Sequence, residues 1–386
     1  MSYQTLFPHR MNQLPIDDVV CCQTTIPRSC LMNMLHDVHF LYPMECEHRP
    51  NILSRVLVCM YELQGDKTQA TNAYQQLLSS LHFLRPVSTA IDIHVDNWEK
   101  HLGDTTCYKS YLYFFDKEIK QHGMVNTLYR YLNAMPLSIH AQLQPLVHLT
   151  FGLEHDLPLM VSEGLAYYAS TLDYASPWIL ENTTTTQPPC SFDDILFDCI
   201  QSDPRFNGVM EGGRPLAAKI KLLLKNHGPL LQQYLSQWFN TSLDNEKRMD
   251  ELMHTTLQLL KQHLLDEPTQ QLLASLLAIR TLYDHQLLSS SHVFPWLQVQ
   301  ALLMMCTFII QGRTRRNSSS SSDIQHPSSL QQDWHHCIQA FVTTTNPPPS
   351  SILLMRSLWK AQQYTDVPNL CLLIANDLVF SIQEVP

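Results

Sequence analysis

The hydrophobic residues of this chain recur with the spacing of amphipathic helices. From Tyr74 to Leu81, and again from Tyr111 to Ile119, apolar side chains follow the i, i+3, i+4, i+7 pattern that places them on one helical face. Gly123 predicts the end of the second helix. Further helices with leucine-rich faces are expected over residues 216–224, 230–239, 249–265 and 269–282. Because no alternating strand of convincing length accompanies them, the pattern predicts an all-α array.

The same pattern predicts one large multi-helix domain over residues 1–386. A chain of 386 residues could hold two domains by length, but no long linker divides the first 310. Residues 1–30 show little periodicity, so the first helix is expected near Asn51. The segment Gln311–Asp333 is serine-rich and almost free of large apolar residues, which predicts a disordered loop because burial cannot offset its ordering entropy.

The run Val293–Ile310 is the most membrane-like stretch of the chain. Pro295, Gln298 and Gln300 interrupt it, and it barely reaches the roughly 20 residues that span a bilayer, so a buried helix is favoured over a membrane span. A net charge of -10 and a pI near 6.0 disfavour nucleic acid as a partner, since a nucleic-acid binder needs a basic face.

The cysteines and the N-terminal residues indicate in which cellular compartment the protein is expected. The 11 cysteines show no Cys-x-x-Cys and no regular spacing, which gives no support to a disulfide framework or a structural zinc site. The N-terminal residues contain no apolar signal-peptide core. We therefore expect a cytoplasmic protein with reduced thiols. Glycine-rich phosphate loops and the Gly-x-Ser-x-Gly elbow are also missing, which disfavours a Rossmann cofactor domain and a serine hydrolase.

Chemistry-bearing residues concentrate in one stretch, residues 144–169, with the sequence QPLVHLTFGLEHDLPLMVSEGLAYYA. On a nearly continuous helix His148 and His155 would share a face, as i and i+7 do. Gly152 would allow a close approach or a kink between them. Such a segment can direct His148 into a core.

The second half of this stretch is predicted to form a new helix. Pro158 suits the first helical position, and Asp156 before it suits a cap. Glu163 is expected on the polar side of that helix. Elsewhere, Glu45, Glu47 and His48 show no ligand spacing and are interpreted as a solvated loop.

Three segments resemble the questin oxidase-like proteins of fungi. Residues 144–154, QPLVHLTFGLE, are similar to the family motif His-Pro-x-Ile-His-Leu-Gly-Tyr-Gly-Leu-Glu. Residues 97–123 resemble the family stretch with Asn-Trp, Leu-Gly, Tyr-x-x-Tyr, Phe-Phe, Glu-Ile and Gly in this order. Residues 51–74 are similar to its first helix and the following turn. The resemblance covers most of residues 45–365.

This resemblance implies an oxidoreductase that acts on a small aromatic, polyketide-like molecule. Molecular oxygen would be inserted in a Baeyer-Villiger reaction or used for ring cleavage, with NADPH as reductant. Neutral imidazoles from separate helices can converge on a redox metal in a helical core, so a non-haem iron is the implied cofactor.

Several histidines of the family pattern are replaced in this chain. The first-helix element Asn-His-x-x-His reads Asn51-Ile52-Leu53-Ser54-Arg55, and Gln144 stands for the first histidine of the central motif. His148 is kept, and His285 corresponds to the histidine of a later His-x-Leu-Thr-Ser element. In the family's last element the histidine and the lysine are lost, with Leu353 at the lysine position, and Arg356 is kept.

The resemblance thus gives His148, Glu154 and Arg356 as catalytic candidates and His148 and His285 as candidate metal ligands. Glu154, His155 or His48 would have to complete the ligand set, so we expect reduced or altered metal binding. His148 could equally be a core histidine that bonds to a carbonyl or carboxylate, and His285 a surface residue paired with Asp284.

Aromatic residues provide the candidate substrate pocket. Trp98, Tyr111 and Phe115, with His155, would line it, although an aromatic stripe at helical spacing is more often core. The competing hypothesis for the whole chain is a non-catalytic helical scaffold or ligand-binding protein that keeps the family fold after the loss of its ligands. The metal content of the purified protein would separate the two hypotheses.

Overall fold

The computed structural model describes residues 26–84, 91–180, 188–208, 215–314, 333–344 and 346–383. In these ranges the chain forms fifteen α-helices joined by short 3-10 turns. Their extended structure is one small antiparallel hairpin, β1 (Glu45–Cys46) and β2 (Arg49–Pro50), with Glu45 opposite Pro50, and an isolated bridge between Ser138 and Tyr174. The prediction of an all-α fold is confirmed.

The helices are numbered in the order in which they follow one another along the chain. They are α1 (Arg28–Leu41), α2 (Leu53–Glu62), α3 (Lys67–Leu78), α4 (Tyr108–His122), α5 (Met124–Ala134), α6 (Gln144–Glu154), α7 (Pro158–Ser170), α8 (Phe192–Asp194), α9 (Leu216–Phe239), α10 (Asn245–Gln262), α11 (Glu267–Asp284), α12 (Ser290–Ile310), α13 (Trp334–Thr343), α14 (Pro349–Ala361) and α15 (Pro368–Gln383). A π-helical turn, Ile195–Ile200, continues α8.

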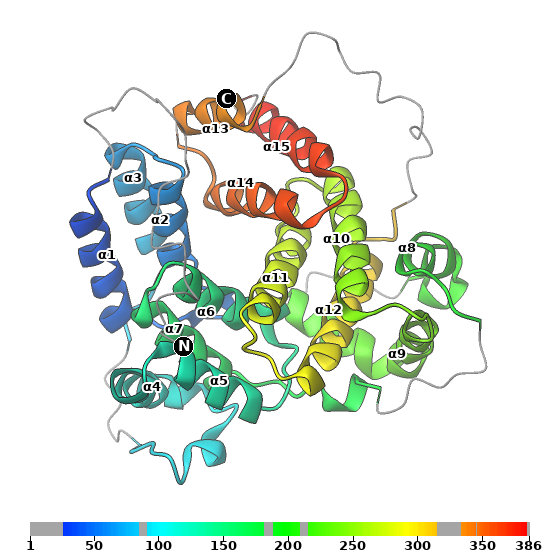
Figure 1. The fold of residues 1–386 in the computed structure, drawn as a ribbon, viewed down its shortest axis with the longest axis horizontal. Helices are drawn as coiled ribbons and strands as arrows, with labels where there is room; N and C mark the ends of the chain where they lie inside the picture. Colours follow the sequence, from blue (N-terminus) through cyan, green and yellow to red (C-terminus); the bar gives the residue numbers. More distant parts are fainter. Residues whose placement is uncertain are drawn as a thin grey trace.

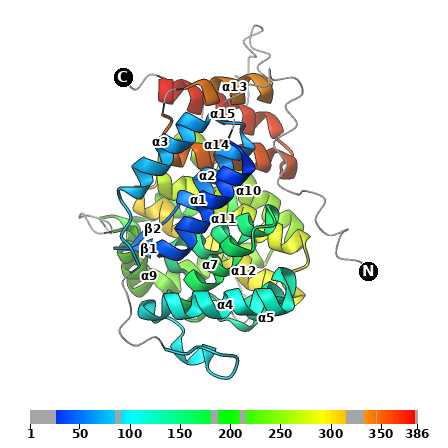
Figure 2. The ribbon, with the colours of Figure 1, turned by 90° about the vertical axis from the view of Figure 1, so that its left-hand side faces the viewer.

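The helices surround a common core in which α6, α7, α11 and α12 are central. In Figure 1, α1 to α3 lie along one edge, α8 and α9 at the opposite edge, and α13 to α15 across the top. Figure 2 shows α4 and α5 at the end of the molecule opposite α13 and α15. Helix α6 packs against α7 and α11, and α14 packs against both α2 and α11, so the last part of the chain closes onto the first.

Helix α12 is the most apolar helix of the core. Its stretch His292–Ile310 is long and apolar enough to cross a membrane, but 83% of it is buried against the rest of the protein. It packs against α9, α10 and α11. The prediction of a buried helix rather than a membrane span is confirmed for this segment.

Two glycines allow α6 and α7 to cross closely. A Cβ atom at Gly152 would lie 2.7 Å from the backbone nitrogen of Val161, and one at Gly164 would lie 2.5 Å from Cβ of Leu149. Only hydrogen fits at both positions, so the backbones approach more closely than larger side chains permit. The expected close approach at Gly152 is confirmed, and it brings the side chains of α6 and α7 together.

Several predicted element bounds were wrong. Helix α1 precedes the expected first helix near Asn51. The segments 216–224 and 230–239 form the single helix α9, in which Gly228 provides room for the ring of Trp178. Pro158 does begin α7, but Leu157 is the residue before it and no side chain caps the helix, so Asp156 is not the predicted cap.

The expected serine-rich loop Gln311–Asp333 is only partly described. Residues 315–332 lie outside the described residues. At its start, the Arg313 guanidinium donates hydrogen bonds to the carbonyl oxygens of Ile200 and Asp203, at 3.2 and 2.6 Å. At its end, Asp333 caps α13. The first part of the predicted loop is therefore bonded to the body through Arg313, and its last residue belongs to the start of α13.

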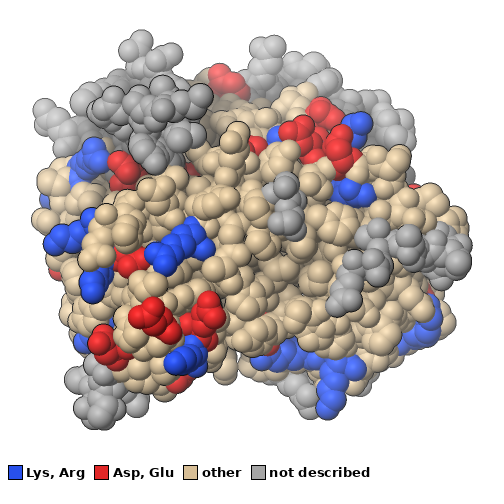
Figure 3. Space-filling model, turned by 60° about the horizontal axis from the view of Figure 1, so that its bottom comes forward, with Lys and Arg blue, Asp and Glu red and all other residues tan. Residues whose placement is uncertain are grey.

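The molecular surface carries few charges, as a charged fraction of 16% implies. On the face in Figure 3, acidic and basic side chains are scattered among large uncharged areas and do not gather into one basic patch.

Candidate functional site

His148 lies at the contact between α6 and α7. Its side chain is completely buried, and its Nε2 atom lies 2.6 Å from Oε2 of Glu163 on α7. Glu163 is itself 2% exposed, so the expectation that it lies on a polar side of its helix was wrong. A buried carboxylate needs hydrogen-bond partners to offset its lost hydration, and His148 provides one.

His39 of α1 provides the second partner of Glu163. Its Nδ1 atom lies 3.0 Å from Oε1 of Glu163, and its Nε2 atom lies 3.0 Å from Oδ2 of Asp116 on α4. The Ser162 hydroxyl donates to the other oxygen of Asp116, at 2.5 Å. We call Asp116, His39, Glu163 and His148 the His148 network. It joins α1, α4, α6 and α7 and ends at Asp116, whose side chain is 30% exposed.

The charges of the His148 network follow from its contacts. Burial alone would lower the pKa of His39, but the hydrogen bonds and charges of Asp116 and Glu163 outweigh it and raise this pKa to about 9. Burial would raise the pKa of Glu163, but its bonds to both histidines hold it below its usual value. Burial lowers the pKa of His148, although Glu163 opposes this. At neutral pH the network therefore contains a protonated His39, an ionised Glu163 and a neutral His148.

Arg55 of α2 lies beside this network as a second buried cation. Its guanidinium donates to the side-chain oxygen of Gln144, at the start of α6. Among the described residues no carboxylate pairs with it, and its Nε atom has no hydrogen-bond partner. Burial lowers the pKa of Arg55 to about 10, so the group remains charged at neutral pH. Its charge contributes to the low pKa of His148.

A separate charged cluster lies on the next face of α6. Glu154 forms ion pairs with Arg356 and Lys360 of α14. Arg356 also contacts Glu62 of α2 at 3.2 Å, and Glu62 contacts Nε2 of His155 at 2.7 Å. We call these five residues the Glu154 cluster. It holds α2, α6 and α14 together across up to 294 positions of sequence.

The charges of the Glu154 cluster stabilise one another. Burial would raise the pKa of Glu154, but Arg356 and Lys360 hold it well below its usual value. Burial would lower the pKa of His155, but Glu62 raises it. A cavity of about 10 Å³ adjoins Glu154, Arg356 and Lys360 and has room for a single water molecule. Glu154 and Arg356 are thus part of a buried ion-pair cluster, and among the described residues the cavity beside them has the size of a single water molecule.

Comparison with protein families identifies the family of the chain. The family model described as questin oxidase-like matches residues 50–357, a span that includes α2 to α13 and most of α14. The chain belongs to the questin oxidase-like family. A Baeyer-Villiger oxidase of Pestalotiopsis microspora is 21% identical over 122 residues, which cover 28% of this chain and 27% of that protein. The similarity therefore spans about a quarter of the relative.

The family pattern predicted His148 and His285 as ligands of one metal. The structure places them beside different charges: those that act on His148 belong to Glu163, Arg55 and His39, and those that act on His285 belong to Glu154, Lys360 and Asp284. Neither histidine belongs to a group of three or more ligand atoms within 4.8 Å of one another in the described residues. A metal at His148 and His285 stays a prediction, without a ligand set around it.

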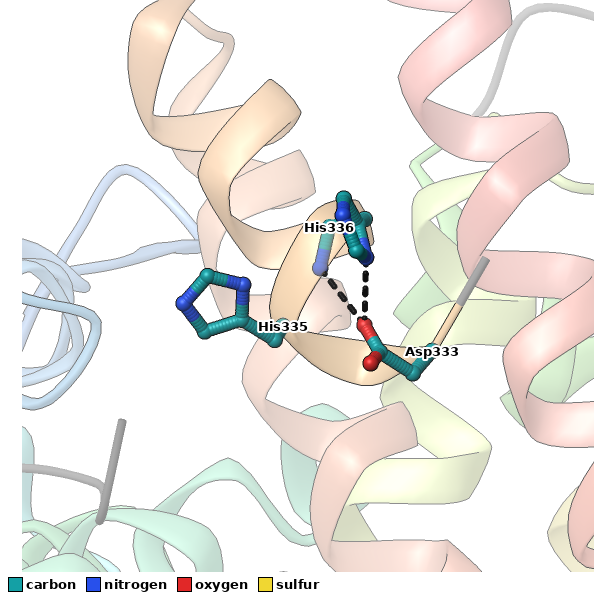
Figure 4. Close-up of side chains that lie close together, drawn as sticks. All are labelled: Asp333, His335 and His336. Carbon is teal, nitrogen blue, oxygen red and sulfur yellow. Dashed lines mark hydrogen bonds and ion pairs between the residues drawn. The ribbon is translucent and has the colours of Figure 1, made fainter. Parts of the chain in front are cut away.

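One group of described residues does meet that ligand spacing. Asp333, His335 and His336 lie at the start of α13, where Oδ1 of Asp333 bonds both the backbone nitrogen of His336, at 3.0 Å, and its Nδ1, at 2.8 Å (Figure 4). The His335 ring points to the other side of the helix turn. Asp333 and His336 are exposed, and the bonds between them account for their position as a helix cap.

The aromatic candidates for the substrate pocket are buried against one another. Tyr111 donates to the carbonyl oxygen of Trp98 at 2.5 Å, and Trp98 and Phe115 both contact the ring of Tyr131 edge-on. A cleft of about 450 Å³ lies on the outer side of α4, where Tyr113 and Phe114 contribute the aromatic lining. Substrate contact by Trp98, Tyr111, Phe115 and His155 stays a prediction.

Glu45 corrects the interpretation of its segment as a solvated loop. Its Oε2 atom accepts a hydrogen bond from the Tyr167 hydroxyl and pairs with Nε2 of His140, both at 2.6 Å. Glu47 and His48 are exposed, as expected. His48 lies 3.9 Å from Glu45 and is not among the contacts of His148. One carboxylate of the segment is thus structural.

Sequence reasoning missed three members of the buried site. His39 precedes the matched family segment, and no motif singles it out. Asp116 resembles the other charged residues of an amphipathic helix. Arg55 was noted only as a replaced histidine, although a charged residue within the apolar run from Leu53 to Met60 was a signal that its side chain is buried.

Proposed function

We propose that this questin oxidase-like chain is an oxidoreductase that uses molecular oxygen on an aromatic, polyketide-type substrate. The reaction is a Baeyer-Villiger insertion or an oxidative ring cleavage. The family match over residues 50–357 supports this assignment, and the relative from Pestalotiopsis microspora is named for the first of these reactions. The observation that carries the proposal is the buried, neutral His148 within the central family motif, held by Glu163.

In this proposal His148 acts as the general base. A neutral imidazole accepts a proton from a substrate hydroxyl, which leaves an electron-rich phenolate that reacts more readily with an oxidant. The charge of Arg55 favours this phenolate because the guanidinium has no carboxylate partner among the described residues. Glu163 stabilises the protonated His148 that results.

The cofactors implied by the family were tested against the residues that surround His148. A non-haem iron site commonly has two histidines and one carboxylate with open positions. His39, Glu163 and His148 have this composition, but both Glu163 oxygens bond the two rings, and the three ligand atoms do not gather within 4.8 Å. Arg55 adds a positive charge beside them. These residues do not fit a preformed iron site. NADPH is proposed only as an external reductant.

Turnover with labelled oxygen gas tests the proposed function. The purified protein is supplied with an aromatic polyketide that carries both a ketone and a phenolic hydroxyl, with NADPH and isotopically labelled O₂. Oxygen insertion takes one labelled atom into the product and one into water, with one NADPH oxidised. We expect the labelled product with the wild-type protein and a loss on the order of 100-fold or more with His148→Gln. Unlabelled product, or equal rates for both proteins, would count against this assignment.

The second candidate is a helical ligand-binding or scaffold protein without catalysis. The bond between Arg55 and Gln144 favours it, since both residues stand where the family pattern has histidines. In that case the substrate binds with equal affinity in the wild-type and His148→Gln proteins and is not consumed. Binding measured by calorimetry together with turnover separates the two candidates.

A further inference from the structure

The residues of the His148 network form a chain of hydrogen bonds, and of these residues only His148 lies in the central family motif. It begins at the half-buried Asp116 and continues through His39 and Glu163 to His148 over three hydrogen-bonded contacts of 3.0, 3.0 and 2.6 Å. Each carboxylate oxygen used in these contacts faces one ring nitrogen. His39 lies in α1, before the matched segment, so this chain of hydrogen bonds connects a helix outside the family match to the central motif.

The contacts determine which nitrogen of His148 carries the proton. An ionised carboxylate only accepts hydrogen bonds, so the 2.6 Å contact to Glu163 requires a proton on Nε2 of His148. Nδ1 of a neutral ring is then bare. Nδ1 is also the atom that has no hydrogen-bond partner among the described residues, and a buried N–H without a partner would cost more than a buried lone pair.

Glu163 can fix this tautomer only while its own orientation is fixed. Its carboxylate sits between two rings, and a rotation that keeps the bond to His148 must also keep the bond to His39. His39 in turn is held by Asp116, whose second oxygen accepts the Ser162 hydroxyl. Asp116 thus holds His39, and His39 holds the Glu163 carboxylate through Oε1, while Oε2 bonds His148.

We propose that His39 is a positioning residue, which Asp116 holds and which orients Glu163, so that His148 is fixed with its proton on Nε2 and presents Nδ1 as the reacting atom. This deepens the proposed function, on which the role of Nδ1 toward substrate rests. The tautomer itself is a property of the folded protein and does not depend on turnover. Carboxylates behind a functional histidine commonly set its orientation in this manner.

Nitrogen NMR of protein labelled on its histidine rings tests the tautomer directly. The His148 signals are assigned by their loss in His148→Gln. We expect one ring nitrogen of His148 with the shift of an N–H and one with that of a bare nitrogen, the N–H being Nε2. In His39→Gln and in Asp116→Asn we expect a mixture of the two tautomers at His148. Asp96→Asn is the matched control for the loss of an acidic charge, since Asp96 is almost fully exposed.

His155 provides an internal control within the same samples. Its Nδ1 bonds the carbonyl oxygen of Phe151 and its Nε2 bonds Glu62, so its signals should not change in either variant. Asp116 lies at the half-exposed end of the network. Asp116→Asn is therefore the variant to measure if His39→Gln does not fold. A proton on Nδ1 of wild-type His148, or an unchanged tautomer in both variants, overturns the proposal.

Kinetics then separate this proposal from the proposed function. If the protein turns over, His39→Gln should lower kcat by about 10- to 100-fold with little change in KM, because substrate contacts are kept. An unchanged kcat with mixed tautomers would overturn the role of Nδ1 as reacting atom. If the wild-type protein shows no turnover, the proposed function fails, and the NMR result still decides the role of His39.

Discussion

Arg55 and Gln144 are hydrogen-bonded to each other in the core, although they are 89 positions apart in sequence. Both stand at positions where the questin oxidase-like pattern has a histidine, one in the first helix and one in the central motif. Two imidazoles at these positions would lie near His148. The replacement therefore changes one connected part of the core, in which a cation and an amide take the place of two potential ligands.

The replacement predicts weak metal binding. A guanidinium beside His148 repels a metal cation and offers no lone pair, and the amide oxygen of Gln144 already accepts its hydrogen bond. After expression in iron-supplemented medium, we expect clearly less than one equivalent of iron in the wild-type protein. Arg55→His combined with Gln144→His should raise that content. Arg55→Met removes the cation without adding a ligand and is the control; full iron occupancy in the wild type would contradict the prediction.

The raised pKa of His39 predicts a fall of stability in mild alkali. Its pKa is raised from 6.5 to about 9, so the protonated ring stabilises the folded state fully below pH 6.5 and loses this contribution as the pH rises through about 9. This shift corresponds to a decrease on the order of 3 kcal/mol in the free energy of unfolding. His39→Gln should lack this decrease. Denaturant titrations of both proteins across this range measure it, and parallel pH profiles would show that His39 is not charged in the fold.

The helical pattern predicted most of the fold because the apolar faces of α4, α10 and α11 are long and regular, and α12 is apolar around its whole circumference. Pro229 suggested a break, but α9 continues through it, and Gly228 beside it leaves room for the Trp178 ring. Helix α1 was missed although its buried Leu31, Leu35 and Val38 have the i, i+4, i+7 spacing of one helical face.

The candidate site was predictable only in part. His148 could be identified because it lies within a recognisable family motif. Its partners come from α1, α4 and α7, and a contact between residues 39 and 163 leaves no local trace in the sequence. Glu154 and Arg356 were found from their motifs, but their joint role as an ion-pair cluster needed the positions of α2 and α14.

The crossing of α6 and α7 predicts a specific sensitivity to one methyl group. Gly164→Ala would place Cβ 2.7 Å from the backbone nitrogen of Leu149, so a helix must shift, at a cost of roughly 1–3 kcal/mol or more. Gly65→Ala is the control, since its nearest atom is the flexible Cε of Met60, at 2.7 Å. Thermal unfolding of both variants tests the difference. Equal destabilisation would show that the crossing is not close-packed at Gly164.

The Glu154 cluster predicts a large cost when one of its cations is removed. Arg356→Met leaves Glu62 and Glu154 buried with fewer positive charges, and breaking a buried pair in this way typically costs about 3–5 kcal/mol. Replacing Glu154 as well, in Arg356→Met with Glu154→Met, should cost less than the sum of the single changes, because the second change removes the uncompensated carboxylate. Denaturant unfolding of the four proteins of this cycle gives the coupling energy. Lys247→Met, which breaks the exposed pair with Asp244, should cost only about 0–1 kcal/mol. Additive effects at Arg356 and Glu154 would show that the cluster does not hold α6 and α14 together.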